Sequence, residues 1–371
     1  MQQRERRPGV KVATVAGVPV YVGASWALIA LVIVALVGPS IARSRPDLGV
    51  WAYGVAVLIA FQLLVAVLVH EAAHAIAARA YGLPVLRVVA DLWGGHTAFE
   101  SGRSQPGSAA VIAVVGPLSN GLLALLAWLA LQTGPTGIPN TLLGGFALLN
   151  AVLAGFNLLP GLPLDGGQLV ESAVWKATGS RTRGMVVAGW CGRVVTVLVI
   201  AWVLARPLAT GRQLDLFDVV WALFIASFMW AGASAAIRGG QVLAAVKQVS
   251  VAEVLSPALG VAHDERLDNA LARWVPGQPI VVLDPTGRPS AVVEPEAVGH
   301  VPHGRYAETG MSAVSRPQPH GWAVEAAPGD DIVAVITAMQ SLGTPLVAVT
   351  HQGRFLGVVT AADVNRAVES L

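Results

Sequence analysis

The chain has 371 residues, of which 54% are hydrophobic and only 12% are charged. Soluble globular domains carry about 25% charged residues, so this composition excludes an ordinary soluble protein. Residues 1–249 hold 17 Lys or Arg and 9 Asp or Glu, a net charge of +8, whereas residues 250–371 hold 7 and 13, a net charge of −6. We therefore expect a membrane domain over 1–249 and a water-soluble domain over 250–371, and the charge balance argues against a nucleic-acid partner.

Six apolar segments approach or exceed the roughly 20 residues that cross a bilayer as a helix. They are 25–41, 51–79, 108–131, 142–159, 185–205 and 219–237. If the N-terminus is cytoplasmic, the inside segments hold twelve Lys or Arg and the outside loops hold four. The positive-inside rule then predicts a polytopic α-helical protein of the cell membrane with six spans and both termini in the cytoplasm.

Short strands are expected beside the first two spans. VATVAGVPVYVGASW (12–26) alternates apolar and small residues, and GLPVLRVVADLWGGHTAFESG (82–102) is too polar and too rich in glycine to span a membrane. The second stretch predicts a β-hairpin. Because open strand edges cannot face lipid, these strands must pair with each other, with a partner chain or with something in a water-filled cavity.

The stretch HEAAH (70–74) ends an otherwise uncharged span. His70 and His74 share one face of a helix and can bind one ion, and Glu71 is close enough to take a proton from water at that ion. Ionisable groups at membrane depth are costly, and a metal would compensate that cost. The alternative is a polar cluster that binds neighbouring helices to one another.

A catalytic zinc site usually has a third protein ligand. Asp165 is the best candidate, because it lies in NLLPGLPLDGGQ (157–168), where prolines break a helix at membrane depth and two glycines allow close approach. Glu171 and Asp91 are weaker candidates, and His96 is expected not to bind.

An internal repeat marks the region after residue 249. Residues 278–298 align without gaps on 344–364, with 7 of 21 positions identical, and an amphipathic stretch precedes each copy (267–275 and 331–342). Each copy predicts a strand, a turn at Gly-Arg, a second strand and the start of a helix. We expect two β-α-β-β-α units, at about 250–300 and 309–371, in one α/β module.

HEAAH, the later NLLPGLPLDGGQ and the intervening GPLSN (116–120) together resemble the site-2 protease family of intramembrane zinc metalloproteases. GVPVYVGASW (17–26) also matches, although the family commonly has His where this chain has Gly23. The resemblance implies that His70, His74 and Asp165 bind one Zn²⁺ per chain and that Glu71 is the general base.

The resemblance further implies that Asn120 and Asn157 assist by hydrogen bonding to the substrate backbone or the developing oxyanion. From the residues alone, either amide suits helix packing equally well. The family's activity would be cleavage of a transmembrane segment in a membrane-bound substrate, for example an anti-sigma factor, within the lipid bilayer. The hairpin at 82–102 would receive the unwound substrate by strand addition.

VAEVLSP (251–257) and GVVTAADV (357–364) resemble a tandem pair of cystathionine-β-synthase (CBS) domains. Such pairs often bind adenine nucleotides such as ATP, ADP or AMP, here through Thr360 and Asp363. The first copy has Glu294 and Ala297 at those positions, so the resemblance implies one nucleotide site. A helix N-cap explains Thr360 and Asp363 equally well.

The resemblance also implies a homodimer that pairs through the CBS domains. Two other functions stay open from the sequence. One is a CBS-regulated transporter or channel, because CBS pairs also occur on membrane transport proteins. The other is a catalytically inactive membrane scaffold.

Overall fold

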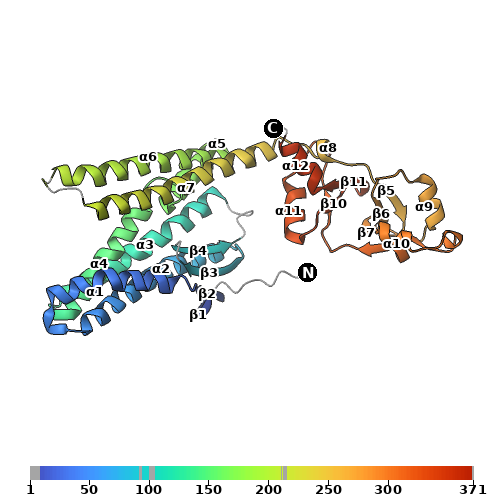
Figure 1. Cartoon of the computed structure of the whole chain (residues 1–371). Coiled ribbons are helices and arrows are strands. Elements are labelled where there is room, and N and C mark those ends of the chain that lie inside the picture. Colours follow the sequence, from blue (N-terminus) through green and yellow to red (C-terminus); the bar gives the residue numbers. More distant parts are fainter. Residues whose placement is uncertain (1–8, 92–93, 100–104, 210, 212–214, 370–371) are drawn as a thin grey trace. The chain divides into compact units, whose positions relative to one another are not determined.

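The computed structural model describes residues 9–91, 94–99, 105–209, 211 and 215–369. The chain divides into two compact units, residues 1–240 and 241–371 (Figure 1). The boundary falls inside the last long helix, nine residues before the boundary expected from composition.

Six helices in the described part of the chain are long and apolar enough to cross a membrane. They are α1 (Trp26–Ser44), α2 (Trp51–Ala80), α3 (Pro106–Leu131), α4 (Gly137–Asn157), α6 (Arg181–Ala209) and α7 (Leu216–Val246). They follow the six predicted segments in order, which confirms a polytopic helical membrane protein. Many of their large apolar side chains are exposed, as lipid-facing residues are, for example Leu31, Leu148 and Leu198.

The helix α5 (Asp165–Thr178) follows the broken segment after α4 and was not anticipated from the sequence. It is too short and too polar to cross a membrane, so hydropathy alone does not predict it. Its first residue is Asp165, and its last turn closes at Gly179, whose positive φ of 70° suits a glycine at a helix C-terminus. The turn between α4 and α5 thereby fixes where Asp165 lies.

A four-stranded sheet belongs to the membrane unit, with strand order β1-β2-β3-β4. Its strands are β1 (Val10–Val15), β2 (Val18–Val22), β3 (Val85–Asp91) and β4 (Gly94–Phe99). The pairs β1–β2 and β3–β4 are antiparallel and β2–β3 is parallel. Val18, Val20 and Val88 are buried against Ala75 of α2, so the sheet packs on the helix that carries HEAAH. Strand β3 thus pairs with both β2 and β4, and β4 is the last strand of the sheet among the described residues. Residues 92–93 and 100–102 lie outside the described residues.

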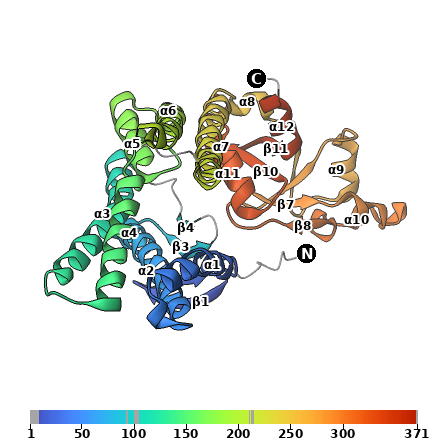
Figure 2. The same cartoon turned by 60° about the vertical axis from the view of Figure 1, so that its left-hand side comes forward.

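The second unit is an α/β repeat. Its first copy contains α8 (Val251–Val254), β5 (Leu259–Ala262), α9 (Leu267–Arg273), β6 (Ile280–Leu283), β7 (Pro289–Val293) and α10 (Pro295–Gly299). Its second copy contains β8 (Ser315–Pro317), β9 (Ala323–Glu325), α11 (Val333–Leu342), β10 (Leu346–His351), β11 (Arg354–Thr360) and α12 (Ala361–Glu369). Each copy therefore has the expected order of strand, helix, two antiparallel strands and helix, and α11 and α12 lie against the β10–β11 hairpin (Figure 2).

The two copies exchange their opening segments. Strand β8 begins the second copy but pairs with β7, with Val293 opposite Ser315. Conversely, Val251 and Val254 of α8 begin the first copy but are buried in the core that Val349 and Val359 form in the second. Neither copy completes its core without the other, so the repeat forms one module.

Candidate metal centre and its surroundings

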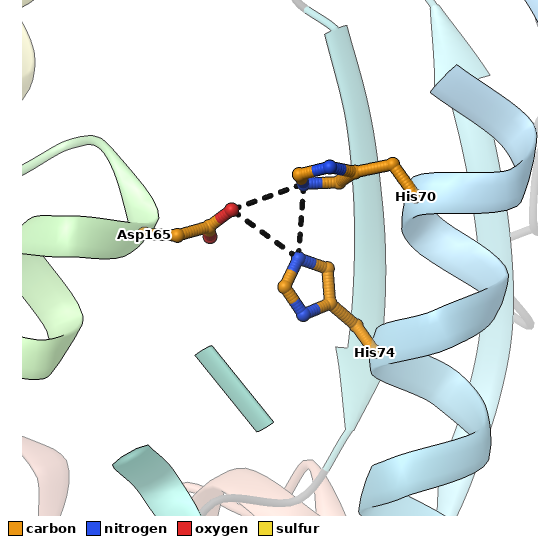
Figure 3. Close-up of side chains that lie close together, drawn as sticks. All are labelled: His70, His74 and Asp165. Atoms are coloured by element: carbon orange, nitrogen blue, oxygen red, sulfur yellow. Dashed lines mark hydrogen bonds and ion pairs between the residues drawn. The ribbon is translucent and has the colours of Figure 1, made fainter. Parts of the chain in front are cut away.

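His70 and His74 lie one turn apart on α2, and both side chains point toward Asp165 at the start of α5 (Figure 3). Their Nε2 atoms are 3.1 Å apart. The Oδ2 atom of Asp165 lies 3.0 Å from the Nε2 of His70 and 3.4 Å from that of His74. All three residues are 8% exposed. The structure thus brings together the three residues expected to bind the metal, from segments 91 positions apart.

Hydrogen bonds on the far side of each ring fix where the protons lie. The Nδ1 of His70 is 2.6 Å from the Oδ1 of Asn120, and the Nδ1 of His74 is 2.6 Å from the carbonyl oxygen of Ile112. Both partners are acceptors, so each Nδ1 donates and each Nε2 keeps a lone pair. Two lone pairs and a carboxylate oxygen therefore face one another, and Asp165 Oδ2 has no hydrogen-bond donor. A cation bound between them would relieve this repulsion.

The geometry fits zinc. Zinc bonds of 2.0–2.1 Å in tetrahedral geometry place neighbouring ligand atoms about 3.3 Å apart, close to the separations of 3.0, 3.1 and 3.4 Å found here. Gly116 of α3 faces the same space: a Cβ on it would overlap the Nε2 atoms of both histidines. Three protein donors would leave a fourth ligand position free on a zinc ion held here, as in catalytic zinc sites.

The other residues of the predicted site lie around this group. Glu71 is buried next to His70 on α2, with 7% of its surface exposed. Asn120 of α3 is fully buried and contacts His70. Asn157 is the half-buried last residue of α4, at the start of the turn that leads to Asp165.

The weaker ligand candidates lie elsewhere or are not described. Glu171 is one and a half turns along α5 from Asp165 and accepts a hydrogen bond from Arg181 at 3.0 Å. The side chains of Asp91 and His96 lie outside the described residues.

Two further polar residues near the site were not predicted from the sequence. Gln168 lies one turn after Asp165 and donates to its Oδ1 at 3.4 Å. Asn150 of α4 is fully buried and accepts a hydrogen bond from Asn120 at 2.8 Å. An uncompensated amide in the middle of an apolar span was the available signal for Asn150.

In the repeat module, Thr360 and Asp363 bond to each other at the start of α12. Thr360 donates from its hydroxyl and its backbone N–H to Asp363 Oδ2, and the N–H of Asp363 donates back to the hydroxyl of Thr360. These contacts are those of a helix cap. Burial by itself raises the pKa of Asp363, but hydrogen bonds from Thr360 and Ser256 outweigh it and hold that pKa below the usual aspartate value.

The same two residues face a cavity of about 500 Å³. Its lining comes from both copies: Ser256, Pro257, Val275, Pro276, Gly277, Gln278, Pro279, Thr360, Ala362, Asp363 and Arg366. A cavity of this size is within the range of small-ligand sites.

Comparison with known proteins gives consistent results. The sequence profile of Peptidase family M50 matches residues 135–201, which include Asn150, Asn157 and Asp165. Two curated relatives are each named a "putative zinc metalloprotease". Rip3 of Mycobacterium tuberculosis is 31% identical over 322 residues, covering 84% of this chain and 80% of the relative. A protein of Synechocystis sp. is 25% identical over 373 residues, covering 97% of this chain and 96% of the relative.

Among solved structures, the site-2 protease of Methanocaldococcus jannaschii aligns at 20% identity, covering 62% of this chain and 94% of that one, with a TM-score of 0.43. The CBS domain of a membrane protein from Sphaerobacter thermophilus aligns at 21% identity, covering 35% of this chain and 94% of that one, with a TM-score of 0.29. The sequence relatives settle the family and favour a peptidase over a transporter or channel. With a relative above 30% identity along most of its length, the chain belongs to peptidase family M50, the zinc metalloproteases of the site-2 protease type.

Proposed function

We propose that this chain is an intramembrane zinc endopeptidase that cleaves a peptide bond within the transmembrane segment of a membrane-bound substrate. In this proposal His70, His74 and Asp165 hold one zinc ion and Glu71 is the general base. The observation that carries it is the convergence of three buried metal-ligating side chains inside a unit of six apolar helices. Zinc, when bound there, supplies a Lewis acid that polarises a carbonyl group and water.

Glu71 supports the chemistry by its place on α2. It is buried beside the ligands, so a proton that it takes from water is shielded from bulk solvent and can pass to the departing amine. We also propose that Asn157, the last residue of α4, hydrogen bonds to the substrate backbone or to the developing oxyanion.

The sheet supplies a means of holding the substrate. Strand β4 pairs with β3 and forms one edge of the sheet, and both strands lie against α2. A helical substrate shields its amide bonds, whereas a segment that unwinds and adds to a sheet edge exposes them. We propose that the hairpin at 82–102 receives the substrate in this way.

The charge distribution supports a cytoplasmic orientation for the site. HEAAH lies in the second half of α2, toward the end that the positive-inside rule assigns to the cytoplasm. Cleavage at that depth in the cell membrane would release the cytoplasmic fragment of the substrate, as required for regulated proteolysis of a membrane-held factor such as an anti-sigma factor. Both termini would be cytoplasmic.

The test compares two variants of the full chain. Glu71→Gln keeps the ligands, so we expect it to bind zinc in a 1:1 ratio while losing about 10²–10⁴-fold in cleavage rate. His74→Ala should lose both the zinc and the activity. The readouts are metal content of the purified protein and the cytoplasmic fragments that disappear from cells. Unchanged fragments in both variants, or a wild-type protein without zinc, would contradict the proposal.

We further propose that the cavity beside Thr360 and Asp363 binds one adenine nucleotide, and that this binding regulates cleavage. The cavity's size, the hydroxyl of Thr360 and the guanidinium of Arg366 support this. The first copy has Glu294 at the aligned position, where a carboxylate would repel phosphate.

Binding of a fluorescent ADP analogue to the full chain tests the site. Asp363→Ala should weaken it, and Glu294→Ala, in the other copy, should not. Equal affinity in both variants would count against a site at Thr360. Pairing of two chains through this module remains a prediction, which the mass of the purified protein would check.

A further inference from the structure

A line of hydrogen-bonded side chains runs from His70 away from the metal centre. Asn120 Oδ1 accepts from His70 Nδ1 at 2.6 Å, and Asn120 Nδ2 donates to Asn150 Oδ1 at 2.8 Å. Asn150 Nδ2 donates in turn to the carbonyl oxygen of Phe146 at 2.9 Å. Both asparagines are completely buried, at 0% exposure, and the line joins α2, α3 and α4.

The surroundings fix the direction of the Asn120 amide. Its nitrogen lies between two oxygens, the carbonyl of Ala66 at 3.2 Å and Asn150 Oδ1. If the amide turned over, its own oxygen would face both of these acceptors. The direction of the Asn150 amide is fixed as well, because its Nδ2 donates to the carbonyl oxygen of Phe146, one turn earlier on α4. The carbonyl end of Asn120 therefore faces His70.

This direction decides which nitrogen of His70 carries the proton. Because the carbonyl oxygen of Asn120 faces Nδ1, Nδ1 carries the proton and donates it in a hydrogen bond to that oxygen. In the neutral ring, Nε2 then faces Asp165 without a proton. With the amide reversed, its N–H groups would face Nδ1, and the proton would move to Nε2, where it would point into the metal centre. Without Asn150, one of the two acceptors that exclude the reversed amide is lost.

We propose that Asn150 is a positioning residue of the zinc site, which acts through Asn120 to hold His70 in its metal-binding tautomer. The inference rests on the proposed function and adds a residue to it. It also gives Asn120 a role different from the substrate contact implied by family resemblance, since Asn120 is closed off from any substrate and its oxygen is already bonded.

The experiment measures zinc affinity of the purified full chain by competition with a chelator. Asn150→Leu removes the acceptor for Asn120, and we expect zinc affinity to fall about 10–100-fold, the usual cost of losing an outer partner of a metal ligand. Asn150→Asp keeps an acceptor at the same place and cannot donate to Asn120, so it should bind zinc much more tightly than Asn150→Leu.

The visible spectrum of the Co²⁺-substituted protein gives a second readout, which general loosening of the fold would not mimic. We expect its bands to shift in Asn150→Leu and to return toward those of wild type in Asn150→Asp. The matched control is Gln62→Leu, because Gln62 Nε2 also joins α2 to α4, through the carbonyl oxygen of Leu142 at 3.2 Å, without touching His70.

Unchanged zinc affinity in Asn150→Leu would overturn the inference. An equal loss in Gln62→Leu would overturn it too, since that result assigns the effect to helix packing. Neither result would alter the proposed protease activity. A wild-type chain that binds no zinc would instead overturn the proposed function and this inference together.

Discussion

Gly116 of α3 lies so close to His74 of α2 that a methyl group on Gly116 would overlap the Nε2 atom of that imidazole. The same methyl would crowd the Nε2 of His70. A side chain at position 116 would therefore crowd the two nitrogen atoms that we expect to bind the metal.

We expect Gly116→Ala to lower zinc affinity by at least about 10-fold, because both imidazoles must move for the methyl group to fit. Chelator competition on the purified chain would measure this. Gly121→Ala is the control, since Gly121 lies in the same helix with nothing within 4 Å of its missing Cβ. Equal zinc affinity in the two variants would contradict the close approach seen here.

Asn120→Asp separates the two roles considered for Asn120. An aspartate keeps an oxygen for the Nδ1 of His70 but has no N–H to offer an oxyanion. If Asn120 only positions His70, the variant should bind zinc more tightly than Asn120→Leu but less tightly than wild type, because its second carboxylate oxygen would face the carbonyl of Ala66 and Asn150 Oδ1. Its kcat at saturating zinc should then stay close to that of wild type. If Asn120 instead stabilises the oxyanion, Asn120→Asp should bind zinc normally and lose about 10²–10³-fold in kcat. Single-turnover cleavage of a reconstituted substrate decides between them.

Much of the metal centre could be read from the sequence because its residues obey local rules. The spacing of His70 and His74 fixes them on one helix face, and the prolines before Asp165 mark a break in the chain. Ionisable and amide side chains are energetically costly inside apolar spans, so their presence there indicates a functional site. Six hydrophobic segments likewise predict six helices without knowledge of their packing.

What could not be predicted depends on contacts between segments. Nothing local shows that Asn150 lies behind Asn120, because the meeting of α3 and α4 depends on helix packing. The helix α5 was not predicted because its sequence has neither the hydropathy of a membrane span nor an internal repeat. The exchange of β8 and α8 between the two copies could not be predicted either, since a repeat in sequence suggests contiguous units.

The turn that carries Asp165 is held by close backbone contacts. Gly192 of α6 lies against the carbonyl oxygen of Leu162, and Gly161 in turn lies against Gly192. We expect Gly192→Ala to push this turn away from α6, which would lower the unfolding free energy by about 1–3 kcal/mol and weaken zinc binding by moving Asp165. Thermal unfolding in detergent and chelator competition would measure the two effects.

Gly145→Ala in α4 is the control for Gly192→Ala, because a Cβ on Gly145 would meet nothing within 4 Å. A Gly192→Ala protein with the stability and zinc affinity of this control would show that the turn does not depend on the contact.

Asp363 should make the stability of the repeat module depend on pH. Its pKa is lower in the folded chain than in the unfolded chain, where aspartate has a pKa of about 3.9, because Thr360 and Ser256 donate to its carboxylate. A carboxyl with a lowered folded pKa stabilises the fold fully above its unfolded pKa, and this contribution falls as the pH drops from there through the folded pKa. Asp363→Asn should therefore destabilise the start of α12 near pH 7, and the difference in stability from wild type should shrink below about pH 4.

Hydrogen exchange of α12 in the full chain, followed from pH 7 to pH 3, would measure this difference. Glu369→Gln, an exposed change in the same helix, should show no such pH dependence. A difference between Asp363→Asn and wild type that stays constant over this range would rule out the carboxylate as its source.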